Sequence, residues 1–316
     1  MPTARDVSRP ALIALSAVGA VGAAAAAWGI GVERHLFTVR WHELAVLPAG
    51  ARPLRILHVS DAHMAPWQRR KQRWIAGLAE LEPDLVINTG DNLGHVEGLR
   101  GLRAAFDPLR GVPGFFVHGS NDHVAPSPRN PFKYFAGPSK AKSLQTAEPL
   151  DTQALDGYLT DDLGWHDLNN AAASADAAGH RIAAFGVSDA HRDWDRLDLL
   201  PDLVSGVRGR GPAPDLTLGV THAPYRRVLD GFTSLGADLI LGGHTHGGQV
   251  RIPGSPAALV ANCDIPLRQA RGLSTWRHDG RVVPLNVSAG LGHSIYAPVR
   301  FACRPEASMI VLTPRP

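Results

Sequence analysis

The chain has 316 residues, of which 44% are hydrophobic and 19% charged, and its formal net charge is +3. This composition is typical of a folded globular protein with a large core, in one large domain or two small ones. The small net charge and the lack of any Lys/Arg run argue against a nucleic-acid partner. Only 2 Cys accompany 15 His. Thiolate zinc frameworks are therefore excluded, and any metal ligands should be nitrogen and oxygen atoms.

The N-terminal stretch ALIALSAVGAVGAAAAAWGIGV carries no charge over residues 11–32, which is long enough to span a bilayer. Its Ala and Gly content makes it only weakly hydrophobic on insertion scales, and arginines on both sides give no clear orientation. We expect residues 1–33 to form an uncleaved single-pass anchor in the plasma membrane, with the side of the remaining domain left open. A cleaved signal peptide and an Ala-rich helix of a soluble protein are the alternatives.

Strands and helices are predicted to alternate through the rest of the chain. A first half-buried strand is expected in HLFTVRWHELAVL, where apolar residues alternate. Further strands are predicted in LRILHVSD, PDLVINTGD, GFFVHGSND, RIAAFGVSD, DLTLGVTH, DLILGGHTH, RVVPLNVSAG and EASMIVLTP. Helices are predicted in 68–81, 99–109 and 225–232, between strands. The alternation implies an α/β fold with largely buried strands, and we expect residues 34–316 to form one domain.

Residues able to bind a metal follow successive strands. They are Asp61, His63, Asp91, Asn121, His222, His244 and His246. In α/β sheets, ligands bind at the carboxyl ends of strands, where loops converge. Asp, Asn and Gly are ordinary turn formers, so any one of these residues alone has a structural explanation. Seven at successive strand ends predict a shared metal site.

The donor types indicate which metals would bind. Carboxylate, imidazole and amide oxygen donors suit divalent Mn, Fe, Zn, Co or Mg. A central Asp could bridge two such ions about 3.5–4 Å apart, the arrangement that activates a water and stabilises an in-line phosphoryl displacement. Glycines flank several of these residues, as in GGHTHGG, and would allow a phosphate to approach the backbone closely.

The motifs Asp61-x-His63, Gly90-Asp91, Gly119-x-Asn121-Asp122, His222 and Gly243-His244-x-His246 resemble the ordered motif set of the calcineurin-like metallophosphoesterase superfamily. The resemblance covers roughly residues 54–249, and GGHTHGGQV is similar to a branch of membrane-associated bacterial phosphodiesterases and phosphatases. It implies two mixed β-sheets packed as a sandwich and flanked by helices. It also implies hydrolysis of a phosphomonoester or phosphodiester by a hydroxide that bridges two metal ions.

The same resemblance implies a division of the ligands between the two ions. One ion would be held by Asp61, His63, Asp91 and His246. The other would be held by Asp91, Asn121, His222 and His244, so that Asp91 bridges the pair.

The proton donor to the leaving group is less clear from the sequence. The family pattern is usually Gly-Asn-His-Asp/Glu, and its His is the expected general acid. Alignment on Asn121 puts Asp122 at that position and His123 one residue further on. An ionised Asp is a poor proton donor. A second VSDAH sequence, after the later strand RIAAFGVSD, offers His191 as a further candidate, so the expected catalytic residues are Asp122, His123 and His191.

Residues 124–160 are expected to form a long loop within the domain, rich in Pro, Ser and Lys, because the strand pattern resumes on both sides. It contains an aromatic cluster and four basic residues, which are Phe132, Tyr134, Phe135, Arg129, Lys133, Lys140 and Lys142. The loop leaves the same sheet end as Asn121, so one hypothesis makes it a lid over the site. The alternative is an ordinary solvated loop.

We therefore expect a metal-dependent phosphoester hydrolase with two divalent ions. The N-terminal segment favours a lipid-linked or envelope phosphoester as the substrate. A soluble-substrate nucleotide phosphodiesterase and a non-catalytic or weakly active metal-binding scaffold are the alternatives. Cys263 and Cys303 could form a disulfide in an extracytoplasmic domain or remain two buried thiols.

Overall fold

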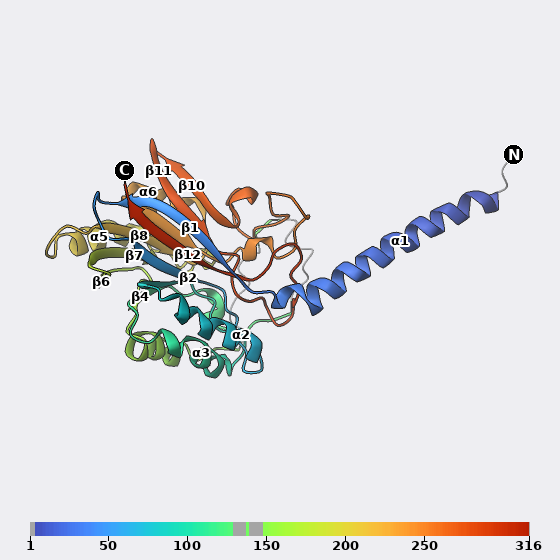
Figure 1. Cartoon of the computed structure of the whole chain (residues 1–316), viewed down its shortest axis with the longest axis horizontal. Coiled ribbons are helices and arrows are strands. Elements are labelled where there is room, and N and C mark those ends of the chain that lie inside the picture. The colour runs from blue at the N-terminus through green and yellow to red at the C-terminus, as the bar shows by residue number, and fades with distance from the viewer. Residues whose placement is uncertain (1–3, 129–136, 139–147, 316) are drawn as a thin grey trace.

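Two six-stranded mixed β-sheets form the body of the protein (Figure 1). The structure, a computed structural model, describes residues 4–128, 137–138 and 148–315, with side chains from residue 11 onward. Within this part of the chain, sheet I has the strand order β1-β12-β2-β3-β4-β5 and sheet II the order β10-β11-β9-β8-β7-β6. The expected α/β fold with two mixed sheets is confirmed.

The strands of sheet I are β1 (Thr38–Leu47), β2 (Leu54–Val59), β3 (Leu85–Asn88), β4 (Gly114–Phe116), β5 (His166–Asp167) and β12 (Glu306–Pro314). Those of sheet II are β6 (Ala171–Ala177), β7 (His180–Val187), β8 (Leu216–Thr221), β9 (Leu239–Gly242), β10 (Gly272–His278) and β11 (Arg281–Val287). Strands β2 to β5 are parallel, as are β7, β8, β9 and β11. The loops after β2, β3 and β4 therefore leave sheet I at one edge, and those after β7, β8 and β9 leave sheet II at one edge.

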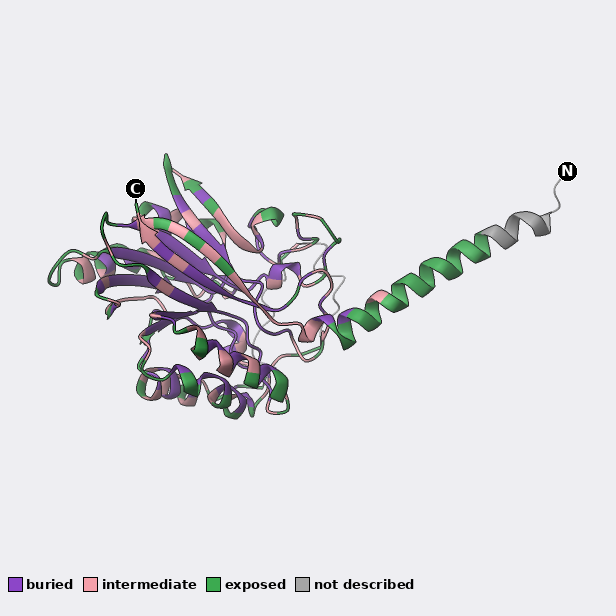
Figure 2. Ribbon diagram, in the orientation of Figure 1, coloured by how far each residue is buried: buried purple, intermediate pink, exposed green. Residues whose placement is uncertain are grey.

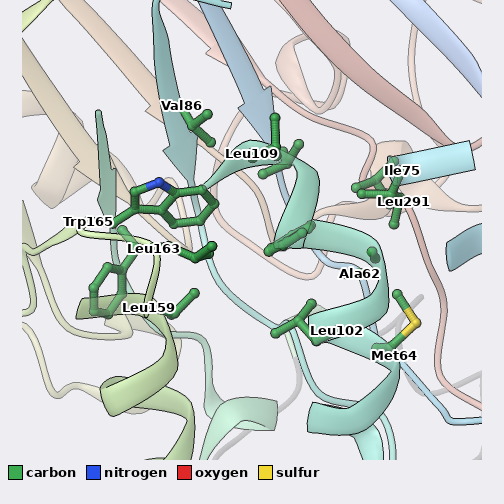
Figure 3. Close-up of a cluster of buried hydrophobic side chains, with 14 of the residues drawn as sticks. Ala62, Met64, Ile75, Val86, Leu102, Leu109, Leu159, Leu163, Trp165 and Leu291 are labelled. Atoms are coloured by element: carbon green, nitrogen blue, oxygen red, sulfur yellow. The ribbon is translucent and has the colours of Figure 1, made fainter. Parts of the chain in front are cut away.

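Three hydrophobic clusters divide the molecule into four layers. Between the sheets, Ile56 and Leu85 of sheet I pack in one cluster with Leu218 of sheet II. The adjacent residue Leu57 faces the other way, into a second cluster beneath the helices of sheet I (Figure 3 shows part of it). Because successive side chains on a strand point to opposite faces, the central strands are mostly apolar and are buried on both sides.

The helices cover the outer faces of the two sheets. Helices α2 (Arg69–Ala76), α3 (Gly98–Phe106) and α4 (Thr152–Gly157) contribute to the cluster against sheet I. Helices α5 (Leu200–Arg208) and α6 (Arg226–Ser234) contribute to the cluster against sheet II, on the far side of the molecule from α2 and α3 (Figure 1). Since the sheets share a core, we propose that residues 34–316 form a single domain.

Helix α1 (Ala4–Gly31) projects away from this body (Figure 1). It is the one helix in the described residues that is long and apolar enough to cross a membrane, and it is exposed along most of its length (Figure 2). The helix matches the expected segment 1–33 and has the length and composition of a membrane anchor or a signal sequence.

The segment expected as a long loop, residues 124–160, is partly helical. Residues 129–136 and 139–147, which include the aromatic cluster and the four basic residues of the expected lid, lie outside the described part of the chain. The base of the segment is closed by hydrogen bonds from Ala125 N to Glu148 O (2.8 Å) and from Leu150 N to His123 O (2.9 Å). Beyond it, the Asp151 carboxylate accepts from Ala154 N (2.9 Å) and caps α4, because Asp is a preferred N-cap residue.

Candidate metal centre

The seven residues expected as metal ligands lie in the loops at the carboxyl ends of β2, β3, β4, β8 and β9. Side-chain ligand atoms of Asp61, His63 and His246 lie within 4.8 Å of one another, and so do those of Asp61, Asp91 and His222. His244 and Asn121 contact this cluster. The structure therefore brings together residues from both sheets, separated by up to 185 positions in the sequence.

The first half of the cluster surrounds His63. Its Nε2 lies 3.2 Å from His246 Nε2 and 3.5 Å from Asp91 Oδ2. His246 Nε2 in turn lies 3.5 Å from Asp61 Oδ1. Two donors each about 2.1 Å from one ion, at right angles or at a tetrahedral angle, lie about 3.0–3.4 Å apart. The observed separations of 3.2 to 3.5 Å are close to this range, so these atoms could hold one metal ion.

The second half surrounds His222. Its Nε2 lies 3.5 Å from Asp91 Oδ2 and 3.3 Å from His244 Nδ1. Asn121 binds Asp91 through its backbone N–H (2.9 Å to Oδ1) and its amide Nδ2 (2.7 Å to Oδ2). The nitrogen of the Asn121 amide therefore faces the cluster here, and a rotation of the amide by 180° would present its oxygen. Asp91 Oδ2 is equally far from His63 and His222 and so stands between the two halves.

Most of the cluster is buried. Asp61, His63, Asp91, His222 and His244 are each at most 9% exposed. Asn121 and His246 are half-buried. The cluster is therefore reached from solvent on the side of these two residues.

Five of the seven residues have a left-handed backbone. The φ angles are 49° for Asp61, 39° for His63, 53° for Asp91, 66° for His244 and 49° for His246. Only a few per cent of non-Gly residues adopt this conformation, and Asp and His are among those that tolerate it. Unfavourable backbone conformations concentrate at functional sites, where packing holds them in place. Each sharp turn returns a side chain from the strand end into the cluster.

Two glycines allow the loops to approach the carboxylates. A Cβ added to Gly119 would fall on Asp91 Oδ1 and lie 2.6 Å from His222 Nε2. A Cβ added to Gly243 would fall on Ser60 Oγ and lie 2.7 Å from Asp61 Oδ2. Only glycine fits at these positions, because no real Cβ comes within 3.0 Å of such atoms.

The protonation states of the Asp and His side chains in the cluster favour the binding of a cation. Burial raises the pKa of Asp61 to about 7, although His222 opposes this. Burial alone would also raise the pKa of Asp91, but His222 and His63 outweigh it and hold the pKa below its usual range. Burial lowers the pKa of His63 to about 4 and that of His246 well below 6.5. His63 and His246 thus offer neutral imidazoles and Asp91 a carboxylate, the forms that bind metals.

The pKa of His222 shifts in the opposite direction and supports the same conclusion. Burial would lower its pKa, but the carboxylates of Asp91, Asp189 and Asp61 outweigh burial and raise it to about 9. In addition, Asp61 Oδ1 is buried and has no hydrogen-bond partner among the described residues. A buried carboxylate oxygen without a donor is rare. Both observations place cation-attracting carboxylates at the centre of the cluster, where a bound divalent cation would replace the proton on His222 and contact Asp61 Oδ1.

Backbone carbonyls hold the outward-facing ring nitrogens of two of the histidines, His222 and His244. His222 Nδ1 donates to Thr89 O (2.7 Å), and His244 Nε2 contacts Asn262 O (3.1 Å). Such partners fix the ring orientation and leave the opposite nitrogen for the metal. The sequence motifs gave no sign of Asn262, which lies in a loop without a recognisable pattern.

Asp122, an expected catalytic residue, is fully buried. Its carboxylate accepts hydrogen bonds from the backbone N–H groups of Asn92 (2.6 Å), Leu93 (3.1 Å) and Gly119 (3.1 Å). The contact with Gly119 makes Asp122 the last residue of a four-residue turn. Residues 119–122 can also be aligned with the pattern Gly-Asn-His-Asp/Glu from its first to its last position. In that alignment Ser120 stands at the Asn position and Asn121 at the His position. In either alignment no histidine stands within the turn.

Next to this turn, His118 is buried between two carboxylates. Its Nε2 lies 2.6 Å from Asp156 Oδ1 and its Nδ1 lies 3.4 Å from Asp122 Oδ2. Burial alone would lower the pKa of His118, but the hydrogen bonds to Asp122 and Asp156 outweigh it and raise the pKa to about 10. His118 is therefore an imidazolium that fixes Asp122.

The raised pKa of His118 predicts a pH dependence of stability. The pKa of His118 in the folded state, about 10, exceeds the ordinary value of 6.5. The stabilisation that protonated His118 gives to the folded state is therefore complete below pH 6.5 and is lost as the pH rises toward 10. We expect the free-energy difference between wild type and His118→Asn to shrink over that range by an amount on the order of a few kcal/mol. Urea unfolding of both proteins at pH 6.5, 8 and 9.5 measures this difference in the free energy of unfolding. A constant difference would contradict the assignment.

The other two candidate proton donors, His191 and His123, have different surroundings. The ring of His191 lies 4.4 Å, between centroids, from that of His244, and its Nδ1 is 2.9 Å from Tyr225 Oη. His123 is half-buried between the rings of His118 and Trp194. The second VSDAH sequence thus leads to the cluster, and Asp189 in it accepts a hydrogen bond from Ser120 N (3.1 Å).

Two buried basic side chains, those of Lys71 and Arg300, support the loops of the cluster and were not expected from the sequence. Lys71 Nζ donates to Ala62 O (2.5 Å) and His63 O (3.3 Å). Arg300, fully buried, donates through Nη1 to His246 O (3.1 Å). Both Cys263 and Cys303 are buried free thiols, so the disulfide alternative does not apply.

Comparisons with known proteins agree with this site. The family model of the calcineurin-like phosphoesterases matches residues 54–248. The chain is 25% identical over 293 residues to the uncharacterized metallophosphoesterase YkuE of Bacillus subtilis (strain 168), covering 89% of this chain and 87% of that protein.

Two solved structures are also similar. The 5'-nucleotidase precursor of Thermus thermophilus has a TM-score of 0.45 at 13% identity, over 83% of this chain and 54% of that chain. The purple acid phosphatase PPD1 from yellow lupin (Lupinus luteus) seeds has a TM-score of 0.39 at 12% identity, over 63% of this chain and 39% of that chain.

The family match and the clustered Asp and His residues define a metal-dependent phosphoester hydrolase. The match spans more than half of the chain, and the protein belongs to the calcineurin-like phosphoesterase family.

Proposed function

We propose that the protein hydrolyses a phosphomonoester or phosphodiester at a centre of two divalent metal ions. Asp61, His63, Asp91 and His246 would hold one ion, and Asp91, Asn121, His222 and His244 the other. The observation that carries this proposal is the position of Asp91 Oδ2, 3.5 Å from both His63 Nε2 and His222 Nε2. Nitrogen and oxygen donors of this kind suit Mn, Fe, Zn, Co or Mg.

Bound at this site, two cations would polarise the phosphoryl oxygens and lower the pKa of a water. The chain itself supplies a fixed geometry for that chemistry. Left-handed turns direct the ligands inward, backbone carbonyls orient His222 and His244, and Lys71 holds the carbonyls beside Asp61 and His63. Half-buried Asn121 and His246 mark the side from which a phosphoester would enter.

We assign different roles to the three expected catalytic residues. Asp122 accepts three backbone N–H groups and is a positioning residue. His191 lies against His244, and burial lowers its pKa to about 2, so it is neutral at physiological pH. A neutral imidazole donates a hydrogen bond to the substrate rather than a full proton. His123, half-buried beside Trp194, remains our candidate for contact with the leaving group.

Replacement of His191 tests its role. We expect His191→Asn to lower kcat/KM for an aryl phosphodiester by roughly tenfold to a hundredfold, because a hydrogen bond to a charged phosphoryl group is lost. Tyr225→Phe removes the hydroxyl 2.9 Å from His191 Nδ1 and should cause a smaller loss of the same kind. Steady-state kinetics measure both. Activity of His191→Asn within twofold of the wild type would exclude substrate binding by this residue.

We further propose that the substrate is linked to a lipid or belongs to the cell envelope, and that α1 is a single-pass anchor in the plasma membrane. Trp67, which follows His63, is 57% exposed, and Tyr296, which precedes Arg300, is 52% exposed. Aromatic side chains of this type favour the interface between membrane and water. Helix α2, after Trp67, packs through Trp74 on Phe37 (ring centroids 5.3 Å apart), close to the end of α1.

A substrate comparison tests the proposed function. Full-length protein in lipid nanodiscs, loaded with Mn, would be assayed against lipid phosphates, nucleotide-sugar lipids, cyclic nucleotides and an aryl phosphodiester. We expect metal-dependent hydrolysis, with the highest kcat/KM for a lipid-linked phosphoester. Turnover of cyclic nucleotides alone would refute the lipid substrate and favour the nucleotide phosphodiesterase alternative. Absence of turnover with every compound would refute the proposed function.

A further inference from the structure

The C-terminal end of α1 packs against the domain and forms hydrogen bonds with it. We call residues 28–33 the anchor base. Within it, Gly29 and Glu33 are buried, whereas the described helix before them is almost wholly exposed (Figure 2). A carboxylate buried to this degree requires hydrogen-bond partners.

Both oxygens of Glu33 have a partner. Oε2 accepts a hydrogen bond from Trp28 Nε1 (2.9 Å), and Oε1 accepts one from the backbone N–H of Cys303 (2.7 Å). One turn earlier, Gly29 O accepts from Arg300 N (3.2 Å), and a Cβ on Gly29 would lie 2.8 Å from Arg300 O. The anchor base therefore holds residues 300–303 by one backbone–backbone hydrogen bond, one hydrogen bond from a backbone N–H to the Glu33 carboxylate, and a close approach that requires glycine.

Residues 300–303 in turn support the turn that carries His246. Arg300 Nη1 donates to His246 O (3.1 Å), and Cys303 Sγ lies 3.4 Å from the same oxygen. Gly247, the next residue, has φ = 61°, and a Cβ there would lie 2.8 Å from Cys303 Sγ. A displacement of Cys303 or Arg300 would therefore move the His246 turn, whose ring nitrogen lies 3.2 Å from that of His63.

We propose that the anchor base is a positioning element of the metal centre, and that Glu33 sets the affinity for the ion bound through His246. The inference rests on the proposed dinuclear centre. It also implies that α1 is retained in the working protein. Removal of the chain up to residue 33, as in a cleaved signal peptide, would leave the N–H groups of Arg300 and Cys303 without their partners.

The experiment uses the full-length protein in detergent, stripped of metal and titrated with Mn by calorimetry. Glu33→Ala removes the link to Cys303. Trp28→Phe removes only the donor to Glu33 Oε2 and serves as the milder change. Glu43→Ala, at an exposed position on β1, is the matched control. We expect two Mn equivalents in the wild type and in Glu43→Ala. One equivalent should bind roughly tenfold to a hundredfold more weakly in Glu33→Ala, the usual range for groups that hold metal ligands.

Weaker binding of only one Mn equivalent distinguishes a role in positioning His246 from a general destabilisation of the protein. Trp28→Phe should weaken the same equivalent by a smaller factor, with the other equivalent unchanged. Unaltered affinities in both variants would overturn the inference, as would equal weakening of both equivalents in step with the melting temperature of the metal-free protein. A wild type that binds no Mn would refute the proposed centre itself.

Discussion

Asp91→Asn is expected to reduce kcat by about a thousandfold or more and to lower the metal content from two ions per chain to one or none. Asp91 Oδ2 is the atom equally distant, at 3.5 Å, from His63 Nε2 and His222 Nε2. Asparagine keeps the shape of the side chain but loses the charge that would hold both ions together. Metal stabilisation of the transition state contributes several kcal/mol, and each 1.36 kcal/mol corresponds to a factor of ten in rate.

The matched control is Asp122→Asn, the same isosteric change at another fully buried carboxylate. Asp122 binds backbone N–H groups on either side of Asp91 rather than the centre itself. We expect its loss of activity to be roughly tenfold to a hundredfold, as is usual for a group that orients ligands, with metal content near two. Equal losses in both variants, with equal metal content, would contradict a bridging role for Asp91. Elemental analysis and kinetics with an aryl phosphodiester provide both readouts.

Gly119→Ala is the second change with a large expected effect. The new methyl group would fall on Asp91 Oδ1 and lie 2.6 Å from His222 Nε2, so Asp91, His222 or the turn itself must move. Gly119 has an ordinary extended backbone, with φ = −101° and ψ = 172°, so the effect would be steric and local. We expect loss of at least about 100-fold in activity, since small misplacements of catalytic groups have effects of this size.

Gly77→Ala is the control for this substitution. Gly77 has helical geometry with φ = −66°, and nothing lies within 4 Å of the position of its Cβ. Alanine is favoured over glycine in helices by up to about 1 kcal/mol. We therefore expect unchanged activity and a slightly raised melting temperature. Wild-type activity of Gly119→Ala would show that the loops around Asp91 are looser than the structure indicates.

The strands that carry the site and their convergence could be predicted from the sequence because both follow from local pattern, whereas β5, β6 and β10 were not predicted. Apolar runs ending in Asp, Asn or His marked β2, β3, β4, β8 and β9, and parallel strands place their carboxyl ends at one edge. Helix α4 within the expected loop could not be predicted because its six residues carry too little periodicity, although Asp151 is an ordinary N-cap residue.

Contacts between distant segments could not be predicted in the same way. Arg300 reaches His246 and Glu33 reaches Cys303 across 54 and 270 positions, and neither pair belongs to a motif. Lys71 is not one of the apolar residues whose spacing predicts its helix, yet its Nζ donates to the backbone carbonyls of Ala62 and His63. Side chains that support a metal site are fixed by tertiary packing, and a single sequence carries no periodic signal for them.

The central claim is that catalysis requires two metal ions held by this cluster. The most direct measurement is the rate of aryl phosphodiester hydrolysis by the metal-free full-length protein as Mn is added in known equivalents. Elemental analysis of the same samples gives the metal bound per chain. The proposed centre predicts little activity without metal and a rate that saturates at two bound ions per chain. Full activity at one ion or none would contradict it, as would two bound ions without turnover, the behaviour of a metal-binding scaffold.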